Sequence, residues 1–395
     1  MRRGADNWDF AELGIKETQG STHFFHHWTA KFIPQIPARV IERYAKPGDV
    51  VLDPFMGSGT TLVEAARRGH DAWGTDINPL AVKIARAKTA PIDGEALSAF
   101  IDWIDEAACN PSRHRARSAR VFEGSDAWFR EDVARAILAI LNRARRLDAN
   151  TRNLVEIGLS DLLKGMSNAR MDRTIPGLPK GATYIDKKHY DRVVDNRRRE
   201  INPFARLRAQ LRRMGAALTE FQAEATGAAE PFAHDARRLA SLGRRAQLAM
   251  TSPPYWSAQN YQKLHLLSFK TLGLKEPGST EIGRRAQDYL ADMNAVVEQL
   301  AEVLDGYFAL VIGESKEGLH EVVCRQCEAQ GMELVDTFRR RLINQAFFAK
   351  AVKTSSSTSS GIRREVYLAR LTGARRRLQR TAGAFQLAAS RRCAG

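Results

Sequence analysis

The pattern of apolar positions in the first part of the chain predicts strands and helices in alternation. A short apolar run ends at Asp53, and apolar residues then recur at helical spacing over 60–68. A second apolar run over 72–76 ends in an acid, and a proline begins the next helix, over 79–88. Strand, helix, strand and helix in succession predict a parallel sheet with crossover helices.

Beyond Pro91 the pattern becomes helical over long stretches. A segment rich in proline and glycine, 174–181, is the main interruption. We therefore predict an all-helical insertion with helices at about 95–108, 126–147, 152–165 and 187–224.

Sheet-like sequence returns in the last part of the chain. Two segments near the C-terminal end, 334–342 and 364–371, read as an antiparallel hairpin with a serine-rich tip at 353–361. Before them we expect strands at 246–251 and 307–312 and helices at 288–304 and 319–330. The expected fold is an α/β doubly wound sheet with a terminal antiparallel hairpin. The expected units are a first core half (1–90), the insertion (91–230), a second core half (231–371) and a flexible basic tail (372–395).

Charge changes this picture by pointing to a partner. Lys and Arg number 61 against 45 Asp and Glu in the 395 residues, which gives a net charge of +16. Within 111–215 there are 24 basic and 12 acidic residues, and within 361–395 nine and one, so the remainder carries 16 − 12 − 8 = −4. Two basic segments beside a near-neutral body predict a polyanionic partner, with nucleic acid the first candidate.

Cysteine content and hydropathy restrict the cellular setting. Four scattered cysteines do not form a disulfide framework, which favours a reducing compartment. The sequence contains neither a long apolar run nor a hydrophobic signal core at its start, so we expect a cytoplasmic protein that associates with the nucleoid through DNA.

A glycine loop follows the first predicted strand. Asp-Pro-Phe-Met-Gly-Ser-Gly-Thr-Thr (53–61) lies between strand and helix, where bare backbone can approach a ligand. Asp76 follows Gly57 by 19 residues and ends the next strand, the position from which a carboxylate accepts ribose hydroxyls. No phosphate-binding Lys-Ser/Thr pair follows the loop, so the spacing favours a nucleoside ligand over ATP.

A second motif, Thr-Ser-Pro-Pro-Tyr-Trp (251–256), follows a buried strand at the carboxyl edge of the sheet. The two prolines fix the backbone and leave carbonyl oxygens free to accept hydrogen bonds. With Ser252 and the ring of Tyr255 they predict a pocket for a flat ring that bears an exocyclic amine.

The two motifs together resemble the amino-methyltransferases of DNA, which transfer a methyl group from S-adenosylmethionine to N4 of cytosine or N6 of adenine. The resemblance covers about 22–90 and 232–371 and implies a Rossmann-like methyltransferase sheet. Lys31-Phe-Ile-Pro34 is similar to the family's segment before the glycine loop, and Asp235 to the carboxylate that binds the adenine amine, although His234 replaces the usual glycine. Ser252 resembles the cytosine-N4 members more than the adenine-N6 members.

The resemblance assigns roles to individual residues. The implied cofactor-binding residues are Lys31, Phe32, Asp53, Phe55, Gly57, Gly59, Thr60, Asp76 and Asp235. The implied catalytic residues are Ser252, Pro253, Pro254 and Tyr255, with Tyr255 stacking on a flipped base. For DNA we expect contacts from Arg197, Arg198, Arg199, Trp256, Asn260 and Tyr261.

Other readings stay open at this point. Adenine-N6 methylation is the close alternative, and an RNA or protein methyltransferase or an inert DNA-binding protein is more distant. Cytosine-C5 methylation is excluded because it needs a Pro-Cys nucleophile, which is absent. We expect no metal, because Cys324 and Cys327 lack a second pair and the histidines at 23, 26 and 27 lack nearby acids.

Overall fold

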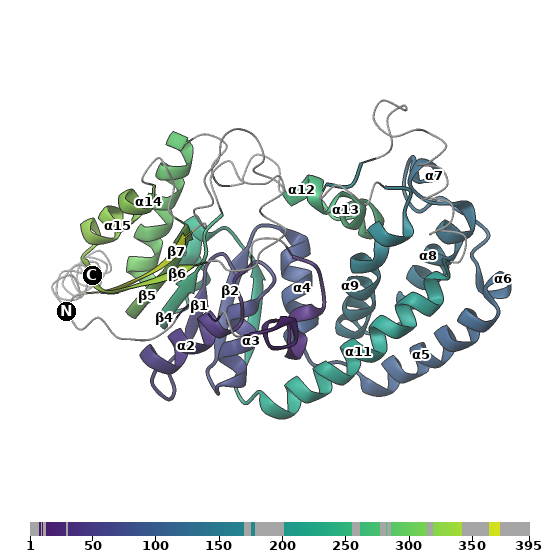
Figure 1. Ribbon diagram of the computed structural model, residues 1–395, viewed down its shortest axis with the longest axis horizontal. Coiled ribbons are helices and arrows are strands. Elements are labelled where there is room, and N and C mark those ends of the chain that lie inside the picture. Colours follow the sequence, from purple (N-terminus) through teal and green to yellow (C-terminus); the bar gives the residue numbers. More distant parts are fainter. Residues whose placement is uncertain are drawn as a thin grey trace, which may run out of the picture.

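A seven-stranded sheet of order β3-β2-β1-β4-β5-β7-β6 forms the centre of the protein (Figure 1). The computed structural model describes residues 8, 10, 13–28, 31–169, 175–177, 201–254, 261–276, 282, 286–313, 319–341 and 363–371. The strands are β1 (Val51–Asp53), β2 (Ala72–Asp76), β3 (Ala229–Ala233), β4 (Ala246–Thr251), β5 (Leu304–Gly313), β6 (Met332–Arg341) and β7 (Arg363–Leu371).

The strand order confirms the doubly wound α/β fold. Neighbouring strands from β3 through β5 are parallel, and β7 runs antiparallel between β5 and β6, which gives the expected terminal hairpin. The chain runs outward from β1 to β3 and returns to β4 on the other side of β1. Ligands of such sheets bind outside the carboxyl ends of the strands where the order reverses, here between β1 and β4.

Strand β3 was not predicted from the sequence. Its residues, Ala-Glu-Pro-Phe-Ala, are mostly half-exposed and contain Pro231, which an edge strand tolerates because one side of its ladder is unpaired. The strand pairs with β2 from Ala72↔Ala229 to Asp76↔Ala233. Its end therefore brings the following residues, His234 and Asp235, beside Asp76.

Helices cover both faces of the sheet. Adjacent β1 residues point to opposite faces: Val51 joins the core under α2 (Gln35–Tyr44) and α3 (Thr60–Arg67), whereas Leu52 joins the other core. That second core lies under the short helix η2 (Ala236–Leu242), α14 (Ala286–Val303) and α15 (Leu319–Ala329). The predicted helices at 60–68, 79–88, 288–304 and 319–330 are confirmed within two residues, with α4 spanning Pro79–Thr89.

The insertion is helical, as predicted, but its helix boundaries differ. One expected helix, 126–147, is two, because Phe129 and Arg130 adopt extended backbone between them and the Phe129 side chain is buried. Of the expected helix 187–224, the structure shows the part from Pro203 onward, and 187–200 lies outside the described residues. The helices are α5 (Gly94–Cys109), α6 (Pro111–His114), α7 (Ser125–Trp128), α8 (Glu131–Ala144), α9 (Ala149–Met166) and α11 (Pro203–Glu224).

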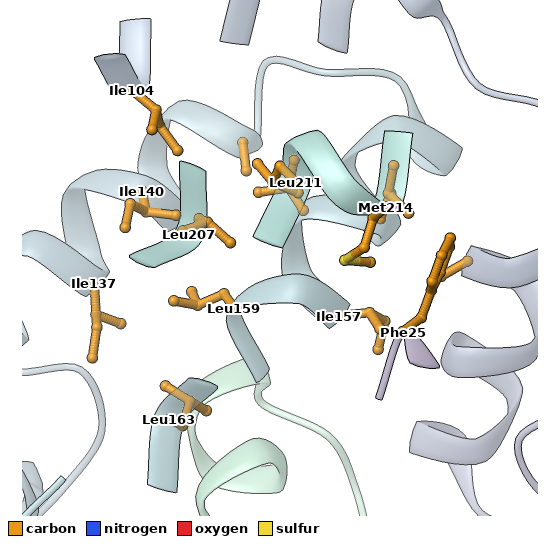
Figure 2. Packing of buried hydrophobic residues seen from close by; sticks show 14 of the residues in the cluster. Phe25, Ile104, Ile137, Ile140, Ile157, Leu159, Leu163, Leu207, Leu211 and Met214 are labelled. Atoms are coloured by element: carbon orange, nitrogen blue, oxygen red, sulfur yellow. The ribbon is translucent and has the colours of Figure 1, made fainter. Parts of the chain in front are cut away.

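One apolar cluster joins this helical part to the sheet half. Figure 2 shows its centre, where Leu159 and Ile157 of α9 lie near Leu207, Leu211 and Met214 of α11. The same cluster includes residues of α4, such as Leu80 and Ile84. The insertion therefore packs directly on the helix that follows β2. The unit boundaries predicted from the sequence are not tested by this packing and stay predictions.

Candidate active site at the switch point of the sheet

The glycine loop connects β1 to α3 and needs glycine at both predicted positions. Gly57 and Gly59 have φ angles of +49° and +75°, which side chains rarely adopt. A Cβ on Gly59 would lie 2.8 Å from Cβ of Ala85 on α4, and a Cβ on Gly57 would lie 3.1 Å from the indole nitrogen of Trp28. The bare loop thus lets Trp28 and α4 approach closely.

Asp76 holds this loop from the neighbouring strand end. Its Oδ2 accepts from the Gly57 backbone N–H at 3.0 Å, and its Oδ1 accepts from the Asn78 N–H at 2.8 Å. A carboxylate oxygen can accept more than one hydrogen bond. The predicted juxtaposition of Gly57 and Asp76 is therefore present.

Asp53 lies beneath the loop and is 2% exposed. Its Oδ2 accepts from the Thr61 hydroxyl at 2.6 Å, and its Oδ1 accepts from the Thr251 hydroxyl at 2.7 Å and the Phe55 N–H at 3.1 Å. Burial raises the pKa of Asp53 to about 6, although these hydrogen bonds oppose the shift. Asp53 thus joins the glycine loop to the end of β4 and has its partners inside the protein.

The second motif begins at the end of β4, next to the hydrogen bond between Thr251 and Asp53. Ser252 follows Thr251 directly, and its Oγ is buried without a hydrogen-bond partner in the part of the chain that the structure describes. A buried hydroxyl without a partner is costly unless a ligand supplies one. Pro253 is buried and Pro254 half-buried, whereas Tyr255, together with the predicted DNA-contacting Trp256 and Asn260, lies outside the described residues.

Two hydroxyl groups of the glycine loop are, like that of Ser252, buried and without a hydrogen-bond partner among the described residues. Ser58 and Thr60 are 2% and 3% exposed, and no described residue makes a hydrogen bond with Ser58 Oγ or Thr60 Oγ1. Both predicted motifs therefore contain buried hydroxyl groups that have no hydrogen-bond partner among the described residues.

Asp235 caps η2 beside the end of β2, because the His234 N–H donates to the Asp76 carbonyl at 3.2 Å. Arg237 donates to its carboxylate through Nε at 3.0 Å and through its terminal nitrogen at 2.6 Å, and also reaches Asp292 of α14 at 2.7 Å. Burial raises the pKa of Asp235, but the hydrogen bonds from Arg237 outweigh it and hold that pKa below its usual value. Arg237 and Asp292 were not predicted from the sequence.

The segment before the glycine loop packs against the helical part. Lys31 donates from Nζ to the His23 carbonyl at 2.7 Å, and burial lowers its pKa to about 8. Phe32 is 6% exposed within the core under α2 and α3. Both residues therefore have contacts inside the protein, and their cofactor roles stay predictions.

A polar link that the sequence did not reveal connects this segment to two distant helices. His26 Nε2 lies 3.0 Å from the Ser160 hydroxyl of α9, which donates to Ser268 of α13 (Leu266–Leu272) at 2.8 Å. Trp28 stacks on His265 with ring centroids 4.9 Å apart and an interplanar angle of 5°. These contacts connect the glycine loop, the insertion and the helices after the second motif.

The structure describes no side-chain contacts for the remaining residues predicted to bind DNA. Arg197, Arg198 and Arg199 lie outside the described residues, and Tyr261 begins α12 (Tyr261–Leu264) without a described side chain. Within the described part of the chain, no group of His, Cys, Asp and Glu side chains is arranged to hold a metal ion. In the same part, no helix has the length and hydropathy needed to cross a bilayer.

The sheet and the glycine loop have the arrangement expected from the sequence, and comparison with known proteins finds similarity to methyltransferases. A family model described as DNA methylase, for the N6 and N4 amino-methyltransferases, matches residues 3–87. Type II methyltransferase M.MvaI of Kocuria varians is 32% identical over 175 residues, which cover 42% of this chain and 38% of that protein. Over these parts the chain is similar to DNA amino-methyltransferases, the family that its two motifs resemble.

Two further similarities were found. Type II methyltransferase M.MjaII of Methanocaldococcus jannaschii is 38% identical over 97 residues, which cover 24% of this chain and 18% of that protein. The solved rRNA methyltransferase aviRa of Streptomyces viridochromogenes aligns with a TM-score of 0.36 at 11% identity, over 93% of this chain and 97% of that chain. The chain thus spans less than two fifths of the length of the two curated relatives.

Proposed function

We propose that the protein is a DNA methyltransferase that transfers the methyl group of S-adenosylmethionine to the exocyclic N4 amine of cytosine. The observation that carries this proposal is the Ser252 hydroxyl, which is buried and has no hydrogen-bond partner among the described residues where β4 ends at the switch point of the sheet. Similarity to DNA amino-methyltransferases supports the reaction class. The choice of cytosine rests on serine at the head of the Pro-Pro motif.

The residues of the glycine loop fit the cofactor. Ser58 and Thr60 offer buried hydroxyls without partners among the described residues, and Gly57 and Gly59 leave the loop without side chains. Asp76 holds the loop through the Gly57 N–H and is the carboxylate that we assign to the ribose hydroxyls. Asp235, at the neighbouring strand end, offers a carboxylate to the adenine amine. When bound, S-adenosylmethionine supplies a methyl group on a positively charged sulfur.

The second motif supplies acceptors for the target amine. An aromatic exocyclic amine is a weak nucleophile because its lone pair is delocalised into the ring. The Ser252 hydroxyl and the Pro253 carbonyl can accept from the two N–H groups and orient the amine. These hydrogen bonds strengthen as positive charge develops on the nitrogen, and the surplus proton then passes to solvent.

A paired base cannot reach this pocket inside a duplex, so the proposal includes base flipping. Tyr255, next in sequence after Pro254, is the residue we assign to stack on the flipped ring. The fixed backbone of the two prolines keeps the acceptors in place before the base arrives.

Substitution of Ser252 tests the pocket. Ser252→Ala is expected to lower the methyl-transfer rate roughly 10- to 1,000-fold and to leave cofactor affinity nearly unchanged, because the hydrogen bond that it removes is on the substrate side. Ser252→Asn keeps a side-chain oxygen acceptor and is the matched control that should retain more activity. Single-turnover kinetics and calorimetric titration measure the two quantities. A wild-type rate for Ser252→Ala would refute the role of this pocket.

A further inference from the structure

The positive charge of the helical insertion divides into two groups once side-chain partners are considered. Many of its arginines contact other residues of the protein: Arg115 and Arg130 pair with Asp132, Arg135 with Glu131, Arg208 and Arg212 with Asp105, and Arg143 and Arg213 lie over aromatic rings. Five exposed arginines have no side-chain hydrogen bond, ion pair or aromatic contact with the described residues: Arg113, Arg117, Arg120, Arg145 and Arg146.

Backbone contacts place two of these five at one end of α8. The Ala116 N–H donates to the Arg135 carbonyl in the first half of α8, and the Val121 N–H donates to the Ser125 hydroxyl at the start of α7. Arg117 and Arg120 therefore lie at the α7 end of the bundle. Arg145 and Arg146 follow the last residue of α8, about 15 Å beyond Arg135 along the helix.

A lysine from another part of the chain joins the cations at the α7 end. The exposed Lys270 of α13 holds its ammonium 5.4 Å from the ring centroid of Phe122, two residues after Arg120. Helices α12 and α13 follow the second motif in the chain. Figure 1 shows α12, α13 and α7 along the same side of the molecule.

We propose that Arg117, Arg120 and Lys270 form a surface that binds the phosphates of duplex DNA beside the target-base pocket. The proposal rests on the proposed function, because the helices beside these cations, α12 and α13, follow the second motif in the chain. Exposed cations without acid partners attract phosphates with little competition from the protein itself. Arg145 and Arg146, at the far end of α8, have the same charge, and we assign them no contact with the duplex.

Salt dependence of DNA binding tests the surface with a matched pair of variants. The full-length protein with Arg117→Gln and Arg120→Gln is compared with one carrying Arg145→Gln and Arg146→Gln, on one fluorescent duplex at several salt concentrations. We expect the first variant to lower the log–log salt slope by about 1.8, roughly 0.9 for each phosphate that is no longer neutralised. The second variant should keep the wild-type slope. Lys270→Gln should lower the slope by about 0.9.

The possible results distinguish a failure of this DNA-binding surface from a failure of the proposed function. An unchanged slope for Arg117→Gln/Arg120→Gln, or an equal change in both variants, would overturn the surface even if the wild type methylates DNA. Methylation assays run in parallel should show a raised KM for DNA and an unchanged kcat in the first variant. If the wild type never methylates DNA but the Arg117→Gln/Arg120→Gln variant has the lower salt slope, the proposed enzymatic function is refuted and the DNA-binding surface is supported. Thermal melting curves that match the wild type exclude misfolding of the variants.

Discussion

At the scale of single residues, the carboxylate of Asp53 joins the two motifs. Its oxygens accept from Thr61 at the start of α3 and from Thr251 at the end of β4. The sequence predicted both motifs but could not predict this tie, because the bond spans 198 positions and depends on β1 and β4 being neighbours. Burial raises the pKa of Asp53, so the contribution of this carboxylate to stability can be measured through its pH dependence.

Stability of the protein should depend on pH through Asp53. Its pKa is raised from 3.8 to about 6, so the folded state holds this proton more tightly than the unfolded state. The corresponding stabilisation is complete below the unfolded pKa and is lost as pH rises through about 6, a difference of about 3 kcal/mol. In Asp53→Asn this pH dependence should disappear. Urea unfolding from about pH 4 to 7 measures it.

The exposed Asp102→Asn is the control and should keep the wild-type dependence on pH. Parallel curves for wild type and Asp53→Asn would contradict the burial of the charge.

Arg237 is a second residue-scale feature, and we expect it to orient Asp235 for the cofactor. Without its bidentate contact, the Asp235 carboxylate loses its fixed direction. Arg237→Gln should raise the dissociation constant of S-adenosylmethionine roughly 10-fold, since charge-assisted hydrogen bonds are the strong ones. Calorimetric titration measures this, with the neighbouring exposed Arg238→Gln as control. Equal affinities in the two variants would exclude the positioning role.

At the scale of elements, apolar periodicity predicted the strands and helices that are buried on a regular face. The strand at Ala246–Thr251 was placed correctly, and α3 and α4 within a residue or two. Strand β3 was not predicted because Pro231 and its half-exposed residues show no alternation of apolar and polar positions. The break between α7 and α8 at Phe129 and Arg130 was not predicted because neither residue is typical of turns. Edges and packing-driven breaks depend on neighbours that a local pattern does not contain.

The close approach of α4 to the glycine loop gives an element-scale prediction. Gly59→Ala has to accept a left-handed φ and a Cβ 2.8 Å from Ala85. We expect a loss of about 2–4 kcal/mol in unfolding free energy, with weaker cofactor binding. Gly243→Ala is the matched control, because Gly243 has φ +65° and a Cβ there would meet nothing within 4 Å.

The Gly243 variant should show the conformational cost of about 1 kcal/mol alone. Chemical denaturation of both variants measures the difference. Equal losses would mean that the packing of α4 against the loop adds nothing.

At the scale of the whole molecule, the helical insertion and the sheet form one packed body. The apolar cluster runs from α4 into α9 and α11, and the link from His26 through Ser160 to Ser268 joins the insertion to the segment before the glycine loop and to α13. The sequence predicted the existence and charge of the insertion but not this attachment, since Trp28 and His265 meet only in the folded chain. Positions that contact the glycine loop, the base pocket and the insertion therefore lie far apart in sequence.

Nucleoside mass spectrometry of DNA incubated with the 395-residue protein and S-adenosylmethionine is the decisive test of the proposed methyl transfer. We expect N4-methylcytosine with the wild type and a much slower yield with Ser252→Ala. N6-methyladenine as the sole product would contradict the cytosine assignment, and no methylated nucleoside at all would contradict the enzyme.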